Sequence, residues 1–125
     1  LLESPLLGSI NIHLGKLPFF KGLSPVVHSI NSQSGKVTVS IHWMTRKIDA
    51  GRVISEKTFK LKNSDTILKL HDLLNMASVD LVINSLKKIN KIKSCQNPNN
   101  TVSNKVNKAA KIGEILKAKK YLRKV

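Results

Sequence analysis

Polar and apolar residues alternate near the start of the chain, which predicts a β-strand. Asn11 and His13 alternate there with isoleucine and leucine, and Gly15 and Pro18 end the pattern. A strand with this pattern turns Asn11 and His13 to one face, close enough to converge on one ligand atom. Both would lie where the chain leaves the sheet, and the carboxyl end of a strand is where open α/β sheets bind ligands. An ordinary strand that ends in two polar residues would show the same pattern.

A second alternation, strict over residues 36–44, predicts a longer strand. Another extended stretch follows at residues 52–61, and residues 45–51 between them are long enough to join two antiparallel strands. This loop carries Asp49 together with a glycine. Loops held by a rigid sheet often carry catalytic groups, so Asp49 is a candidate for function.

Helical spacing of apolar residues predicts three helices. A short one runs from Pro25 to about Asn31, with Ser24 as its N-cap and proline at the first helical position. A long helix begins after residues 63–66, runs to about Lys88 and covers one face of the sheet. A weaker amphipathic pattern from about Lys105 to Arg123 predicts the third.

The positive charge is concentrated at the carboxyl-terminal end. Of a formal net charge of +15, about +11 lies in residues 86–125, where lysines and Arg123 face the single acid Glu114. Residues 91–104, which are polar and rich in asparagine, are predicted to be a linker before the basic helix. Such a surplus favours phosphate-bearing partners. A solvated lysine-rich face would have the same composition.

The chain length of 125 residues allows one domain or part of one. No apolar run approaches the ~20 residues that span a bilayer, and no signal-peptide pattern is present, so no membrane partner is expected. Cys95 is the only cysteine, and with the scattered histidines it forms no metal-ligand spacing. We therefore expect a reducing, cytoplasmic setting and no metal. Because a strand comes so early, we also expect an amino-terminal portion of the fold to be missing.

Asn11, His13 and Asp49 together form the candidate chemical site. A carboxylate beside an imidazole favours the protonated ring and fixes its orientation. An asparagine amide supplies a neutral donor for an oxygen that gains negative charge. Such a set would suit the attack of an amine on a carbonyl, without a metal and without a covalent enzyme intermediate.

Two blocks of the chain resemble the folate-dependent formyltransferase family. Residues 9–22 are similar to its signature, an Asn-x-His pair followed by Leu-Pro, an aromatic residue, a basic residue and glycine. Residues 40–54 are similar to its strand–loop–strand, which ends in Asp-x-Gly-x-Ile/Val-Ile. The order and separation of the blocks also match, and the resemblance covers residues 4 to about 88. The chain departs from the family at Leu14–Gly15, where Pro-Ser is usual.

This resemblance implies an α/β fold of the Rossmann-like formyltransferase type. The fold would be partial, with its amino-terminal half missing, and its mixed sheet would contain an antiparallel strand pair with flanking helices. Residues 1–90 would be the carboxyl-terminal part of the catalytic domain, and residues 91–125 a polar linker with a basic amphipathic helix. Because part of the folate cleft belongs to the missing half, the isolated chain is expected to be catalytically poor.

The resemblance also implies the reaction, transfer of a formyl group from 10-formyltetrahydrofolate to a primary amine. By resemblance, Asn11 would hold the formyl oxygen and His13 would stabilise and protonate the tetrahedral intermediate. Asp49 would tune His13 and help to remove the proton of the amine through water. Folate-binding and acceptor-binding residues are not assigned.

The acceptor remains open at this level. Family members act on methionyl-tRNA, glycinamide ribonucleotide or amino-sugar nucleotides, and we favour a small amine such as an amino-sugar nucleotide. A methionyl-tRNA acceptor is the alternative. A further alternative is a non-catalytic family remnant whose basic tail binds nucleic acid. The sequence predicts no oligomeric state.

Overall fold

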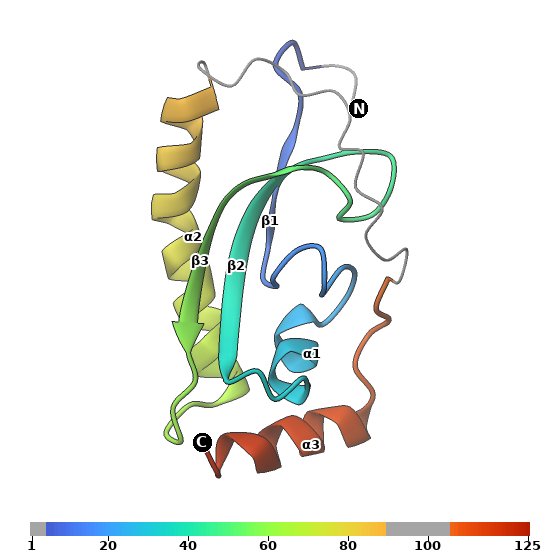
Figure 1. Ribbon diagram of the computed structural model, residues 1–125, viewed down its shortest axis with the longest axis vertical. Helices are drawn as coiled ribbons and strands as arrows, with labels where there is room; N and C mark the ends of the chain where they lie inside the picture. The colour runs from blue at the N-terminus through green and yellow to red at the C-terminus, as the bar shows by residue number, and fades with distance from the viewer. Residues whose placement is uncertain (1–4, 90–105) are drawn as a thin grey trace.

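The computed structural model describes residues 5–89 and 106–125 (Figure 1). In chain order the elements are β1 (Ile10–His13), α1 (Pro25–Asn31), β2 (Lys36–Trp43), β3 (Val53–Lys60), α2 (Ile67–Ile89) and α3 (Ile112–Leu122). In the described residues the strands form one antiparallel three-stranded sheet in the order β1-β2-β3. The predicted α/β fold and antiparallel strand pair are confirmed.

Both faces of the central strand β2 are buried. Its apolar face contributes Val37 and Val39 to the core that also contains Leu70 of α2, the helix that runs along the sheet in Figure 1. Its polar face, with Thr38, Ser40 and His42, is buried as well. Alternation in the sequence shows which residues share a face of the strand, but not whether that face is exposed. Here connecting loops cover the polar face. One core unites both ends of the described chain, and its best buried members are Val26, Ile30, Val37, Val39, Leu70, Leu74, Ala118 and Leu122.

The helix α1 has the predicted bounds and Ser24 is its N-cap residue as predicted, but the side-chain hydrogen bond expected of that cap is absent. Pro25 occupies the first turn as expected, whereas Ser24 adopts a left-handed conformation with φ of 54° and makes no side-chain cap hydrogen bond. Its hydroxyl oxygen instead accepts the backbone N–H of Ala110 at 3.0 Å. A long-range partner has therefore replaced the local one.

The last helix begins later than the pattern predicted. Residues 106–111 are not helical, and α3 starts at Ile112 after Lys111, whose backbone N–H donates to the Glu114 carboxylate at 2.8 Å. The residues before it run beside Lys21–Leu23, which satisfies the backbone N–H and carbonyl of Asn107 without a helix. The linker predicted at residues 91–104 lies outside the described residues, and the division at residue 90 stays a prediction.

The helix α2 has two apolar faces. One side contributes Leu70, Leu74 and Ala77 to the core, while the other leaves an exposed row of Leu73, Met76, Val79, Ile83 and Leu86. None of the described helices is long and apolar enough to cross a membrane.

Candidate active site

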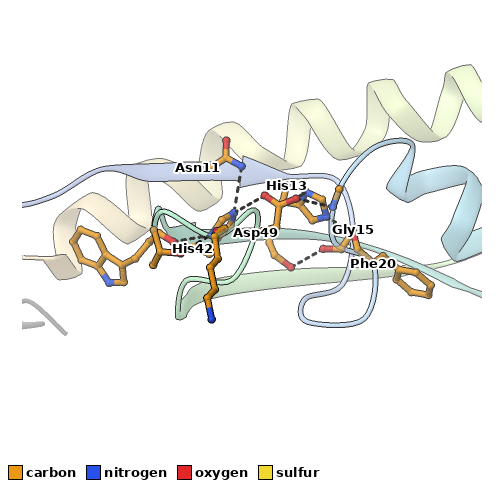
Figure 2. A network of polar contacts seen from close by, with 11 residues as sticks. Asn11, His13, Gly15, Phe20, His42 and Asp49 are labelled. Carbon is orange, nitrogen blue, oxygen red and sulfur yellow. Dashed lines mark hydrogen bonds and ion pairs between the residues drawn. The ribbon is translucent and has the colours of Figure 1, made fainter. Parts of the chain in front are cut away.

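The structure brings Asn11, His13 and Asp49 together, as Figure 2 shows. Asn11 and His13 lie on one face of β1, with Asn11 half-buried and His13 buried. His13 Nδ1 lies 3.4 Å from Asp49 Oδ2, and the Asp49 side chain is 12% exposed. Residues predicted from separate parts of the sequence therefore form one partly enclosed polar cluster.

Backbone geometry aims Asp49 at this cluster. Asp49 has a positive φ of 46°, a conformation that aspartate tolerates better than most residues. Gly51 follows where a Cβ would collide with the carbonyl group of Trp43, so only glycine lets the loop return this closely. The backbone N–H of Gly22 then donates to Asp49 Oδ2 at 2.8 Å. The loop is thus folded tightly enough to fix the carboxylate.

His42 is a fourth member of the cluster, and it was not among the residues predicted from the sequence. Its Nε2 lies 3.2 Å from Asn11 Nδ2 and 3.5 Å from Asp49 Oδ1, so its ring bridges the two (Figure 2). The antiparallel register pairs it directly with Asn11 across β1 and β2. The alternation did place His42 on the polar face of its strand. It could not show that His42 lies opposite Asn11, because alternation does not determine the register between two strands.

The hydrogen bonds of His42 indicate a neutral ring. Its Nδ1 donates to the Trp43 carbonyl at 2.8 Å, which leaves Nε2 to accept an N–H of Asn11 at 3.2 Å. Burial is the main cause that lowers the pKa of His42 below 6.5, and the nearby His13 lowers it further, against the opposing effects of the Trp43 carbonyl and Asp49. A neutral His42 therefore holds the Asn11 amide in one orientation.

His13 has an oxygen facing each ring nitrogen. Its Nε2 donates to the carbonyl oxygen of Phe20, and its Nδ1 faces Asp49. A ring with a proton on each nitrogen satisfies both contacts. Any transfer of the Nε2 proton to a substrate oxygen requires His13 to exchange the Phe20 carbonyl for that oxygen.

The departure at Leu14–Gly15 has a structural counterpart. A Cβ on Gly15 would lie 2.6 Å from Pro25 Cβ and 3.0 Å from His13 Nε2. The carbonyl of Gly15 also accepts the Ser40 hydroxyl at 2.9 Å. The turn after β1 is therefore packed against His13 itself, with no space for a side chain at position 15.

The comparisons with known proteins agree on one family. The formyl transferase family model matches residues 1–86, a range that contains Asn11, His13 and Asp49. A methionyl-tRNA formyltransferase from Staphylococcus aureus (strain JH1) is 34% identical over 89 residues, which are 71% of this chain and 29% of that protein. The chain therefore corresponds to a minor part of this curated relative.

Solved structures of formyltransferases share the fold. An N-formyltransferase from Helicobacter canadensis, in complex with folinic acid and dTDP-3-aminofucose, superposes with a TM-score of 0.68 at 18% identity, over 91% of this chain and 46% of that one. Phosphoribosylglycinamide formyltransferase from Streptococcus pneumoniae TIGR4 superposes with a TM-score of 0.59 at 29% identity, over 64% and 44%. The chain thus spans less than half of each of these structures.

Proposed function

Because this chain belongs to the formyl transferase family, we propose that it provides the reacting side chains for transfer of a formyl group to a primary amine. The donor is 10-formyltetrahydrofolate, and the side chains are Asn11, His13 and Asp49. Their convergence, at the positions of the two family blocks, is the observation that carries the proposal.

Asn11 is suited to bind the formyl oxygen. In the described residues its side chain makes one hydrogen bond, to His42, so that its second N–H remains available. The formyl oxygen gains negative charge as the amine attacks the carbon, and a donor held in place stabilises that charge without reorganising. The neutral His42 prevents the amide from turning away.

His13 and Asp49 are suited to handle protons. The attacking amine must lose a proton, and a partly buried carboxylate that reaches it through one water is a competent base. Asp49 keeps His13 oriented through the 3.4 Å contact at Nδ1. Once His13 Nε2 has left the Phe20 carbonyl, its proton would go to the tetrahedral intermediate. The bond between the formyl carbon and the folate nitrogen would then break, and the leaving folate nitrogen would carry a proton in place of the one that the amine lost.

The chemistry of these groups fits a formyl donor. The cluster combines amide N–H, imidazole and carboxylate groups, which can bind a carbonyl oxygen and move a proton. It lies where β1 ends, and Asn11 and Asp49 are both partly accessible from outside. A bound donor supplies the activated formyl carbon, whereas orientation and proton transfer are the work of this chain.

Donor binding can be measured with 5-formyltetrahydrofolate, which mimics the donor without transferring its formyl group. We expect weak but saturable binding to the 125-residue chain by calorimetry, because the resemblance implies that only part of the folate cleft is present. Asn11→Ala should weaken it about tenfold, because a hydrogen bond to a charged or polarised oxygen contributes ~1.5 kcal/mol. Asn75→Ala, on the exposed side of α2, is the matched control and should bind like the wild type.

A folded wild-type chain that binds no 5-formyltetrahydrofolate would contradict the proposal. Equal weakening by Asn11→Ala and Asn75→Ala would also do so, since the effect would then not depend on the cluster.

For the acceptor, we now favour methionyl-tRNA over the amino-sugar nucleotide expected from the sequence. The curated relative at 34% identity is a methionyl-tRNA formyltransferase. The amino-sugar enzyme from H. canadensis is 18% identical, which bears on the fold alone. Exposed cations of the described carboxyl-terminal segment support an RNA acceptor, and they are Lys108, Lys111, Lys117, Lys119, Lys120, Arg123 and Lys124. The amino-sugar nucleotide is the alternative acceptor.

A further inference from the structure

Residues 106–110, here called the strap, run alongside Lys21–Leu23 although more than eighty positions separate the two segments in sequence. The Asn107 N–H donates to the Lys21 carbonyl at 2.8 Å, and the Leu23 N–H donates to the Asn107 carbonyl at 3.0 Å. Gly22 and Asn107 therefore form a parallel bridge. Two backbone hydrogen bonds fix the peptide groups on either side of Gly22.

Side chains of the α1 region fasten the strap further along. The Ala110 N–H donates to the Ser24 hydroxyl at 3.0 Å, and His28 Nε2 donates to the Lys108 carbonyl at 3.0 Å. Beyond the strap, α3 buries Ala118 and Leu122 in the core. The strap is thus held both by α1 and, through α3, by the core.

The fixed peptide of Gly22 points into the candidate active site. Its N–H donates to Asp49 Oδ2 at 2.8 Å, the same oxygen that faces His13 Nδ1 at 3.4 Å. Gly22 has a φ of 90°, and a Cβ there would collide with the carbonyl oxygen of Asn107 and lie 2.7 Å from Val106 Cγ1. The Gly22 N–H cannot be redirected without moving the strap.

We propose that the strap positions Asp49 through Gly22, so that docking of the carboxyl-terminal segment sets the geometry of the Asp49–His13 pair. Asn107 touches none of the candidate reacting groups, and it is a positioning residue that acts through its backbone. The effect of this positioning on catalysis rests on the proposed function. The coupling between residue 107 and His13 rests on the hydrogen bonds alone.

The coupling depends on which carboxylate oxygen of Asp49 each neighbouring group contacts. Asp49 Oδ1 lies 3.5 Å from His42, while Oδ2 is shared by Gly22 and His13. With the Gly22 N–H in place, the carboxylate cannot rotate without losing a hydrogen bond. When the strap is released, Gly22 can turn, and the carboxylate is free to leave His13.

Proline at position 107 tests this directly, because Asn107→Pro removes the N–H that donates to Lys21. Asn107→Ala is the matched control, since both backbone hydrogen bonds remain. In the 125-residue chain, NMR should show the Gly22 amide proton exchanging about tenfold faster in Asn107→Pro, the effect of losing about one hydrogen bond. The ¹⁵Nδ1 signal of His13 should shift in Asn107→Pro and keep its wild-type position in Asn107→Ala.

A merely structural strap would lower thermal stability without moving the His13 signal, and this result would overturn the proposal. If Asn107→Pro does not fold, Ser24→Ala decides, because it removes the acceptor of the Ala110 N–H and so weakens the docking of the strap. Exchange of the Gly22 amide proton in Ser24→Ala reports how far the strap has loosened, and the His13 signal should shift together with it. Faster Gly22 exchange with an unchanged His13 signal would overturn the coupling. Failure of the formyl-transfer proposal is separate, since it appears as absent 5-formyltetrahydrofolate binding by a wild-type chain with an intact Gly22–Asp49 hydrogen bond.

Discussion

His42 shows how much a single residue of this chain depends on its surroundings. It is 2% exposed, donates from Nδ1 to Trp43 and accepts from Asn11, so its proton position is determined by two neighbours from different strands. A charged ring would lose the Asn11 hydrogen bond and would be poorly solvated. Its neutral state is therefore part of the folded structure.

This residue predicts a pH dependence of stability. The folded-state pKa of His42 is lowered, so the unfolded chain binds more protons once the pH falls below about 6.5. The contribution of His42 to stability is complete above that pH and is lost as the pH falls towards the folded-state pKa. In urea unfolding at several pH values, the free energy of unfolding should fall less steeply with decreasing pH for His42→Gln than for the wild type. The difference should reach ~1.4 kcal/mol for each pH unit that separates the folded-state and unfolded-state pKa values.

Asn75→Gln on the exposed side of α2 changes no titratable group, so it is the control for this measurement and should keep the wild-type slope. An identical acid dependence in wild type and His42→Gln would show that the ring gains its proton without cost in the folded state.

Residue types in the sequence revealed part of the site but not its hydrogen-bond partners. Asn11, His13 and Asp49 are visible in the sequence because polar residues on a strand end and a glycine-containing loop are local signals. His42 could not be assigned in this way, because its role comes from the register that places it opposite Asn11. The Phe20 carbonyl and the Gly22 N–H belong to the backbone, and no residue pattern marks them as partners of His13 and Asp49.

At the scale of elements, the strands and the first two helices were predictable from periodicity to within a few residues. The differences lie where distant segments meet. Ser24 is a favoured cap residue, yet its hydroxyl bonds Ala110, and the residues predicted as the first turns of the last helix form the strap instead. Local propensity is weak compared with satisfied long-range hydrogen bonds.

The turn after β1 provides an element-scale prediction. Gly15→Ala places a Cβ against Pro25 and the His13 ring, and overpacking of this kind costs ~1–3 kcal/mol. Urea unfolding should show that loss of stability. Gly113→Ala, in α3 and with nothing within 4 Å of a Cβ, is the matched control and should leave stability equal or raise it by up to ~1 kcal/mol.

A stability of Gly15→Ala equal to that of the wild type would mean that the turn can move away from α1. The close packing of position 15 would then not explain why this chain has glycine where the family usually has serine.

For the whole molecule, the separation of charge is the dominant feature. The described carboxyl-terminal segment presents exposed lysines on α3, and its acid, Glu114, is engaged at the start of the helix. The cluster around His13 lies apart from this surface in sequence, but the strap connects the two. A large anionic acceptor could therefore contact α3 while its reacting end lies at the cluster.

This arrangement predicts a salt-dependent affinity for tRNA, measured by filter binding or anisotropy. Neutralising three lysines of the carboxyl-terminal segment should reduce the slope of log affinity against log salt by about one for each phosphate that the chain no longer neutralises. The test variant is Lys117→Gln/Lys120→Gln/Lys124→Gln. The control removes the same charge away from α3, as Lys57→Gln/Lys87→Gln/Lys88→Gln.

Equal slopes for the two triple variants would assign the effect to net charge alone and would contradict a specific role for α3. If a dTDP-amino sugar bound the same chain and tRNA did not compete with it, the choice of acceptor would return to the amino-sugar nucleotide.

Trp43 is the single tryptophan of the chain, and its position next to His42 has a practical consequence. Its carbonyl binds the His42 ring, its indole ring lies 3.2 Å from the position of a Cβ at Gly8, and its backbone N–H closes the Asp49 loop through the Arg52 carbonyl. Tryptophan fluorescence from this protein therefore originates from one ring, carried by the residue whose backbone carbonyl binds His42. A change in the cluster that moves the Trp43 backbone can be followed optically in the native chain, without an attached dye.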